Sequence, residues 1–256
     1  MIDIHCHILP GLDDGPETTE ASVNLARTAY EEGIHTIVAT PHHNMQLTEN
    51  EPHTIVEALS ALRVELEKHH IPLELIAGQE VRIHDRFMED LEEKRILPIH
   101  EESNYIYVEL PKDHVPSFTS KLLYDVQIAG YKPVLVHPER NKELLESPDE
   151  LYKLVKYGVY TQLTAASLCG ENGKRIEKFS KQMVEANLAH FIASGANKHS
   201  TTFFLSEAYK VVAQAFGEDM RRQFMVNAEK IVAGEEVSKD MPERIKQKKL
   251  LGIFPR

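Results

Sequence analysis

The sequence predicts an α/β protein in which seven strands close into a distorted (β/α)7 barrel. Strand-like and helix-like stretches alternate along all 256 residues, and a helix follows each of the seven expected strands. Thr36–Ala39 and Val134–Val136 are almost continuously apolar, as is typical of parallel strands covered on both faces. Seven such units favour a closed barrel over an open sheet. Because no Pro/Gly-rich linker divides the chain, we expect one barrel over residues 1–235 and a basic tail over 236–256.

The elements follow from local patterns. Ile2 and Ile4 alternate with polar residues in the first strand, which Pro10 and Gly11 end, and Thr18 or Thr19 caps a helix that runs to about Glu32. Apolar alternation and apolar runs place the other strands at residues 34–40, 73–77, 105–110, 133–136, 160–163 and 190–193. Apolar residues three and four apart place the other helices at residues 52–69, 86–94, 118–129, 151–157, 174–187, 205–216 and 221–233.

Composition excludes several classes of function. Lys and Arg number 29 against 40 Asp and Glu, so the net charge of −11 disfavours nucleic acid as a partner. The two cysteines, Cys6 and Cys169, form no disulfide framework and fit a reducing compartment. No apolar run approaches the roughly 18 residues of a transmembrane segment, and the N-terminus lacks the features of a signal peptide. We therefore expect a soluble cytoplasmic protein.

Side chains that suit metal ions follow the expected strands. His5 and His7 are two residues apart and so point to the same face of a strand. The other polar residues at strand ends are His42, Glu80, Glu109, His137 with Arg140, Thr164 and the turn 194–197. In a parallel barrel these ends meet on one face, where a metal would partner carboxylates that are costly to bury alone. The mixture of imidazole and carboxylate suits manganese, iron or zinc better than magnesium alone.

The chain also resembles a known family. The motifs HCHILPGLDDG, ATPHHN, GQEVR, VELP and VHPER are similar to those of the polymerase-and-histidinol-phosphatase (PHP) superfamily, and more narrowly to its bacterial manganese-dependent protein-tyrosine phosphatases of capsule and exopolysaccharide operons. The resemblance covers nearly the whole chain and implies the distorted barrel of the PHP fold with up to three divalent metals, Mn²⁺ above all, with iron or zinc as alternatives. It also implies that the partner is the phosphotyrosine-containing tail of a bacterial tyrosine kinase.

The resemblance assigns roles by position. The implied metal ligands are His5 and His7 for a first metal, Glu80 bridging to a second, Glu109 and His137 for that second metal, and Asp14 and His42 for a third. Arg140 is implied as the catalytic residue that clamps the phosphate, since its planar fork of donors suits a phosphoryl group. No protein nucleophile is implied, because water activated by the metals attacks phosphorus.

The loop after the seventh strand departs from the family pattern. The family has Ser-Asp-Ala-His there, whereas this chain has Ser194-Gly195-Ala196-Asn197. Gly195 offers no ligand, and the neutral Asn197 is a weaker ligand than imidazole. The Arg usual a few residues later is Thr202 here. We expect weak occupancy of the first and third metal positions and low or absent turnover, with His199 as a substitute ligand from the same loop.

Three other functions and the role of the tail remain open. Cys169 and Arg175 fit the C-x5-R loop of cysteine-dependent phosphatases, although Leu168 and Ile176 replace the usual flanking His and Ser/Thr. The fold could instead bind a phosphotyrosine tail without cleaving it, or hydrolyse histidinol phosphate or nucleic-acid esters. Finally, the basic and apolar tail could dock peripherally on a membrane surface or on the membrane-bound kinase, or be a solvated terminus.

Overall fold

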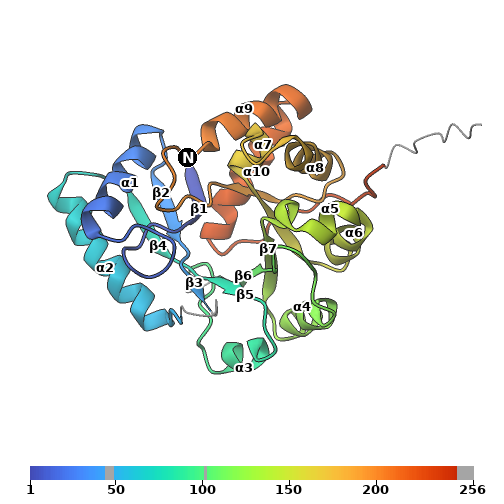
Figure 1. Cartoon of the computed structure of the whole chain (residues 1–256), viewed down its shortest axis with the longest axis horizontal. Helices are drawn as coiled ribbons and strands as arrows, with labels where there is room; N and C mark the ends of the chain where they lie inside the picture. The colour runs from blue at the N-terminus through green and yellow to red at the C-terminus, as the bar shows by residue number, and fades with distance from the viewer. Residues whose placement is uncertain (44–48, 101–102, 247–256) are drawn as a thin grey trace, which may run out of the picture.

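Parallel strands at the centre of the molecule and helices around them confirm the predicted barrel (Figure 1). The computed structural model describes residues 1–43, 49–100 and 103–246. A three-stranded sheet joins β1 (Ile2–Cys6), β2 (Thr36–Ala39) and β4 (Glu74–Ala77). A six-stranded sheet joins, in order, β3 (His42–His43), β5 (Glu80–Arg82), β6 (Tyr105–Glu109), β7 (Lys132–Val136), β8 (Tyr160–Thr164) and β9 (Phe191–Ala193).

The distortion of the barrel lies in its second and third strands, each of which is broken into two short pieces. The second expected strand becomes β2 and β3, interrupted at Pro41, which has no N–H for a strand ladder. The third becomes β4 and β5, interrupted at Gly78, where a Cβ would lie 2.8 Å from Val38 Cγ1. Because each break redirects the chain into the other sheet, His42 and Glu80 begin new strand pieces, and they pair with each other in register.

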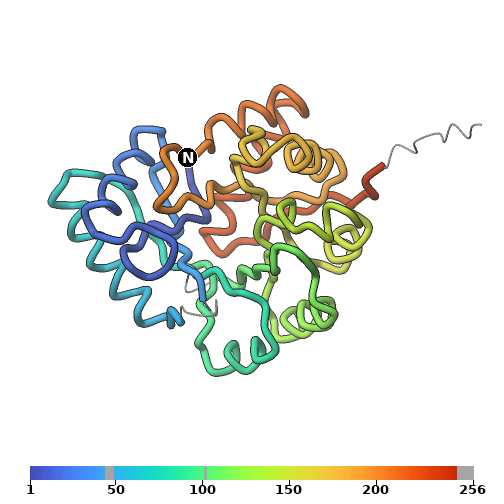
Figure 2. Tube along the Cα trace, viewed as in Figure 1, coloured from blue at the N-terminus to red at the C-terminus, as the bar shows by residue number. Residues whose placement is uncertain are grey.

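The first and last strands close the barrel on each other. Cys6 and Ala196 form a parallel bridge, the His7 N–H donates to Ala196 O at 2.8 Å, and the Gly195 N–H donates to His5 O at 2.9 Å. Figure 2 shows the N-terminal segment, in blue, beside the orange segment that follows β9. The loop at residues 194–197 is thereby held against the His5–His7 segment, although almost the whole chain separates them.

Helices surround the strands, and most lie where the sequence predicts them. They are α1 (Thr19–Glu31), α2 (Pro52–Lys68), α3 (Phe87–Glu92), α4 (Thr119–Ile128), η1 (Pro138–Arg140), α5 (Lys142–Glu146), α6 (Pro148–Lys156), α7 (Ala165–Cys169), α8 (Lys174–Glu185), α9 (Leu205–Phe216) and α10 (Glu218–Val232). Thr18 caps α1, its hydroxyl oxygen accepting the Ala21 N–H at 3.2 Å. The short helices α5 and α7 were not predicted, because five residues show no helical period.

The interior of the barrel is filled by apolar and aromatic side chains toward its amino-terminal end. Tyr107 is fully buried there, and its hydroxyl donates to Ile4 O at 2.6 Å. The His5 ring stacks on Tyr107 with ring centroids 5.4 Å apart. These side chains exclude water from the barrel interior beneath the polar strand ends, so charged groups at the strand ends interact strongly.

The chain after α10 crosses the amino-terminal end of the barrel. Val237 is buried, its N–H donates to the Tyr105 hydroxyl at 3.0 Å, and the Lys239 ammonium lies 3.4 Å from the centroid of the Tyr160 ring. The described part of the predicted tail therefore packs on the barrel, and the boundary at residue 235 stays a prediction. The remainder, 247–256, lies outside the described residues. In the described part of the chain, no helix is long and apolar enough to cross a lipid bilayer.

Candidate metal centre

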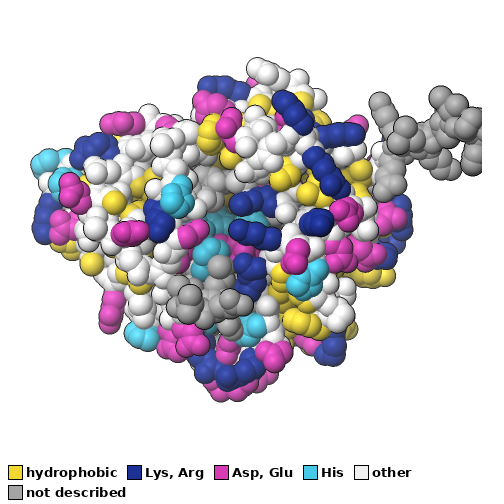
Figure 3. All heavy atoms as spheres, viewed as in Figure 1, with side chains coloured by type: hydrophobic (Ala, Val, Ile, Leu, Met, Phe, Trp, Pro, Cys, Tyr) yellow, Lys and Arg dark blue, Asp and Glu magenta, His cyan; other side chains and the backbone are white. Residues whose placement is uncertain are grey.

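A cleft of about 300 Å³ opens at the carboxyl ends of the strands. All seven ligands implied by the sequence line it: His5, His7, Asp14, His42, Glu80, Glu109 and His137. Arg140, Gly195 and Asn197 also contribute to its wall. Figure 3 shows histidine and acidic side chains at the bottom of this hollow and basic side chains along its rim. The structure therefore brings these side chains together in one cleft, and their role as metal ligands stays a prediction.

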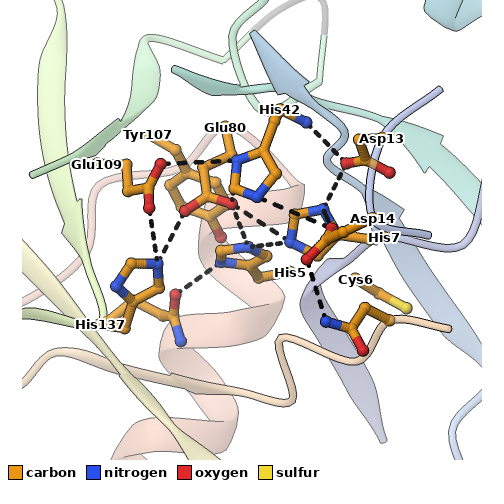
Figure 4. A network of polar contacts seen from close by, with 12 residues as sticks. His5, Cys6, His7, Asp13, Asp14, His42, Glu80, Tyr107, Glu109 and His137 are labelled. Carbon is orange, nitrogen blue, oxygen red and sulfur yellow. Dashed lines mark hydrogen bonds and ion pairs between the residues drawn. The ribbon is translucent and has the colours of Figure 1, made fainter. Parts of the chain in front are cut away.

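Glu80 is the centre of this constellation (Figure 4). Its Oε2 lies 3.1 Å from His5 Nε2, 3.3 Å from His7 Nε2 and 3.2 Å from His42 Nδ1, while its Oε1 lies 2.9 Å from His137 Nε2. Burial alone would raise the pKa of Glu80, but the surrounding imidazoles, His42 and His5 above all, hold it well below its usual value. A single buried carboxylate is thus shared among four imidazoles, two from the β1 segment and one each from β3 and the end of β7.

Hydrogen bonds fix which nitrogen of each N-terminal histidine faces Glu80. The Gln162 amide donates to Leu163 O at 2.7 Å, so its oxygen accepts from His5 Nδ1 at 2.8 Å. Asp13 Oδ2 accepts from His7 Nδ1 at 2.7 Å. Both Nδ1 atoms then carry a proton, so the two Nε2 atoms, which lie 3.3 Å apart, are the ring nitrogens left for a metal. Burial lowers the pKa of His7, but Asp13 and Glu80 raise it well above its usual value, so a metal would displace a proton from His7 Nε2. Together with the Glu80 oxygen, three electron-rich atoms converge on one point, which is the arrangement of a cation site.

Two buried atoms beside this point lack a hydrogen-bond partner among the described residues. They are His42 Nδ1 and Glu109 Oε2, and they lie 3.6 Å apart. Burial and the charge of Glu80 raise the pKa of Glu109 to about 8, although Arg82 donates to its other oxygen at 2.8 Å. A divalent cation would give both orphaned atoms a partner and let Glu109 ionise at neutral pH. The residues present therefore fit a metal centre.

A further group of candidate ligands lies toward the opening. His7, Asp13, Asp14 and His42 each offer one atom within 4.8 Å of the others. Asp14 Oδ1 is 3.4 Å from His7 Nδ1 and 3.8 Å from His42 Nε2. Asp13, the residue that sequence reasoning missed, also accepts the His42 backbone N–H at 2.9 Å. The sequence signal was the Asp-Asp pair itself, of which only the second member was assigned a role.

Gly195 and Asn197 of the loop after β9 both line the cleft. Gly195 has a φ of +59°, and an added Cβ would meet nothing nearer than Thr164 Cγ2 at 3.8 Å, so the space for a ligand side chain is present. The Asn197 amide donates to Asp14 Oδ2 at 3.1 Å, and its oxygen accepts the His199 backbone N–H at 3.0 Å. Asn197 thus presents a donor where a metal ligand would present a lone pair.

His199 does not take part in the cleft. Its side chain is exposed and lines a separate surface hollow beside Glu17 and Thr18. The proposed role of His199 as a substitute ligand therefore has no support in the geometry.

The cysteine-based alternative lacks the microenvironment that it needs. Cys169 ends the five-residue helix α7, is half-buried, and lies outside the lining of the cleft. Burial and the nearby carboxylates raise the pKa of its thiol to about 11, which opposes formation of a thiolate. Arg175 is exposed, 3.9 Å from Glu146. Arg140, by contrast, reaches the wall of the histidine cleft.

A distorted β/α barrel with clustered histidines and carboxylates at its strand ends defines a PHP-type metal-dependent hydrolase fold. A solved histidinol phosphate phosphatase of Lactococcus lactis shares this fold, with a TM-score of 0.55 at 10% identity over 84% of this chain and 95% of that one. The profile described as "Capsular polysaccharide synthesis, CpsB/CapC" matches residues 1–233, and the chain belongs to this family.

Two further comparisons concern near relatives. The tyrosine-protein phosphatase YwqE of Bacillus subtilis is 43% identical over 255 residues, covering 99% of this chain and 100% of that protein. A chain from the crystal structures of YwqE and of CpsB from Streptococcus pneumoniae, described as unique metal-dependent tyrosine phosphatases, superimposes with a TM-score of 0.93 at 43% identity. That comparison covers 96% of this chain and 100% of the other.

Proposed function

We propose that this chain is a metal-dependent tyrosine-protein phosphatase of capsular or exopolysaccharide synthesis, that its metal is Mn²⁺, and that its substrate is the phosphotyrosine-rich tail of a partner tyrosine kinase. The observation that carries the proposal is the buried Glu80 carboxylate shared among four imidazoles beside Arg140. The activity in the names of the relatives supports the choice of phosphotyrosine.

The residues of the cleft have separable tasks. His5, His7, Asp14, His42, Glu80, Glu109 and His137 would hold the metals. When bound, divalent metals supply an activated water and neutralise charge on the phosphoryl group. Arg140 would donate to the phosphoryl oxygens through its planar fork. Because the histidines and carboxylates of the lining would all be occupied by metal, the proposed reaction uses water and no protein nucleophile.

The walls of the cleft suit an aromatic leaving group. Leu110, Pro111 and Ile176 give it an apolar side on which a tyrosine ring can pack. A tyrosinate has a solution pKa of about 10 and leaves more readily than the alkoxide of serine. Contact with the ring and the better leaving group together favour phosphotyrosine over phosphoserine.

We further propose that the loop at Gly195 and Asn197 weakens the first and third metal positions. Gly195 contributes no side chain, and the Asn197 amide donor points at Asp14. The position between Glu80, Glu109 and His137 keeps its full set of side chains and would be filled first. Turnover would then need more added metal than a complete site requires.

The test is hydrolysis of a phosphotyrosine peptide and of p-nitrophenyl phosphate in saturating Mn²⁺, with and without chelator. We expect phosphate release that chelator abolishes and that Cys169→Ser leaves intact. Phosphate release that survives chelation would overturn the metal assignment. Binding of the peptide in Mn²⁺ without any release would favour the second candidate, a phosphotyrosine-binding protein, which the altered loop specifically motivates.

A further inference from the structure

Two lysines belong to adjoining backbone segments beside the cleft. Lys112 follows β6 and lines the cleft together with Arg140, and Lys142, two residues after Arg140, begins α5. Both are exposed, and among the described residues neither has a carboxylate within 4 Å. In contrast, Lys174 and Lys181 on α8 both pair with Glu177. In a chain with a net charge of −11, unpaired cations at the opening of the site need an explanation.

The backbone holds the two lysines together. The Lys142 N–H donates to Lys112 O at 2.9 Å. The buried Asn141 amide donates to Pro111 O at 2.7 Å and to His114 O at 2.9 Å. The loop after β6 and the start of α5 are therefore tied to each other at three points, so the backbones that carry the two lysines stay next to each other.

The nearby acids attract these lysines but form no ion pair with them among the described residues. The Asp113 carboxylate accepts from His114 Nδ1 at 2.9 Å, and Glu143 Oε2 accepts the Val115 N–H at 2.8 Å. Lys112 acts on Glu109 and Lys142 on Asp113 only at longer range. Both ammonium groups are therefore available to an anion at the cleft.

We propose that Lys112 and Lys142 form a second anion-binding subsite, which binds an acidic group next to the phosphotyrosine in the substrate peptide. The inference rests on the proposed function and deepens it, because it names a sequence preference of that site. Arg140 and the metals take the phosphoryl group, and the lysine pair takes a neighbouring carboxylate or a second phosphoryl group. The enzyme would prefer peptides in which the acidic group lies at the right distance from the phosphotyrosine.

The experiment compares three peptides that carry one phosphotyrosine flanked by Glu, by Gln, or by a second phosphotyrosine. The wild type should show a kcat/KM about three- to tenfold higher for the Glu peptide than for the Gln peptide at low salt, in line with exposed ion pairs. The preference should shrink in 0.5 M NaCl, which screens exposed charges. In Lys112→Gln/Lys142→Gln the two values should converge. The doubly phosphorylated peptide shows which anion is preferred.

The matched control is Lys178→Gln, which removes an exposed, unpaired lysine on α8 and should keep the preference. If the preference for the Glu peptide fell equally in Lys178→Gln and in Lys112→Gln/Lys142→Gln, it would reflect the overall charge of the protein, and the subsite would be overturned. The same peptides with a non-hydrolysable phosphonate are titrated calorimetrically, so the ranking is measured even without turnover. Equal affinities for the Glu and Gln peptides would overturn the subsite and leave the phosphatase proposal standing. Tighter binding of the Glu peptide without any turnover would support the subsite and overturn the phosphatase proposal.

Discussion

His5 Nε2 and His7 Nε2 lie 3.3 Å apart, and both face the same oxygen of Glu80. Each ring faces another acceptor with Nδ1, His5 with Gln162 and His7 with Asp13. Two ring nitrogens and a carboxylate oxygen can lie this close only with a positive charge among them. Burial lowers the pKa of His7, but Asp13 and Glu80 raise it well above its usual value, so a proton on His7 supplies that charge until a metal displaces it.

Asp13 sets the orientation of His7, so its removal should weaken metal binding between His5, His7 and Glu80, a position to which Asp13 itself contributes no ligand. In Asp13→Asn the amide no longer fixes the proton on His7 Nδ1, and we expect Mn²⁺ affinity to fall about 10- to 100-fold. Isothermal titration with Mn²⁺ measures this, with the exposed Asp219→Asn in α10 as a control of equal charge change. Unchanged affinity in Asp13→Asn would mean that His7 is oriented by other contacts.

Restoring the missing ligands should increase both metal content and turnover. Gly195→Asp fits, because a Cβ there meets only Thr164 Cγ2 at 3.8 Å, and Asp tolerates a positive φ better than most residues. Asn197→His replaces an amide donor that faces Asp14 with an imidazole. We expect the double variant to bind about one more Mn²⁺ and to hydrolyse p-nitrophenyl phosphate about tenfold faster at limiting Mn²⁺. No gain in either quantity would show that the loop is already compensated.

Arg140 should be sensitive even to a change that keeps its charge. In Arg140→Lys one ammonium replaces a planar fork, so bidentate contact with the phosphoryl group is lost. We expect kcat/KM for a phosphotyrosine peptide to fall about 10- to 100-fold, with Mn²⁺ content unchanged because Arg140 is not a ligand. If kcat/KM stayed at the wild-type value, another group would have to hold the phosphate.

His190 should make the fold sensitive to acid. Burial, together with Lys239, lowers the pKa of His190 to about 3, and its Nδ1 accepts the Thr161 N–H at 3.1 Å. In the unfolded chain this imidazole binds a proton near pH 6.5, whereas in the folded chain it does so only near pH 3. The contribution of neutral His190 to the free energy of unfolding is therefore complete above pH 6.5 and is lost as the pH falls toward 3. The loss is at most about 1.4 kcal/mol per pH unit.

His190→Asn keeps an acceptor for Thr161 and removes the titration. The variant should be less stable at pH 7 but show a flatter decline of unfolding free energy between pH 6 and pH 4, as measured by urea unfolding at each pH. Identical slopes for the variant and the wild type would show that His190 is not held neutral in the folded chain.

The barrel and its strand ends could be predicted because apolar periodicity is local. The alternation that begins at Ile2 and the cap at Thr18 both follow rules that span a few residues. The split of the second and third strands could not be predicted in the same way. It depends on how closely Gly78 approaches Val38 across the sheet, which no local pattern records.

The same division holds for the metal centre. The strand-end histidines and carboxylates were found because a parallel barrel brings such positions together. Gln162 and Asp13 were missed, because their function is to orient His5 and His7 and depends on side-chain directions. The exposed position of His199 could not be predicted either, since the conformation of the loop decides which of its side chains enters the cleft.

If these imidazoles and carboxylates hold divalent metal, the metal content of the protein depends on Glu80. Wild type and Glu80→Gln are loaded with Mn²⁺, desalted and analysed by mass spectrometry, with circular dichroism as a check of folding. We expect at least about one Mn²⁺ per wild-type chain and a loss of most of it in Glu80→Gln, because the shared carboxylate is gone. Equal manganese in the two folded proteins, or none in either, would contradict the metal assignment.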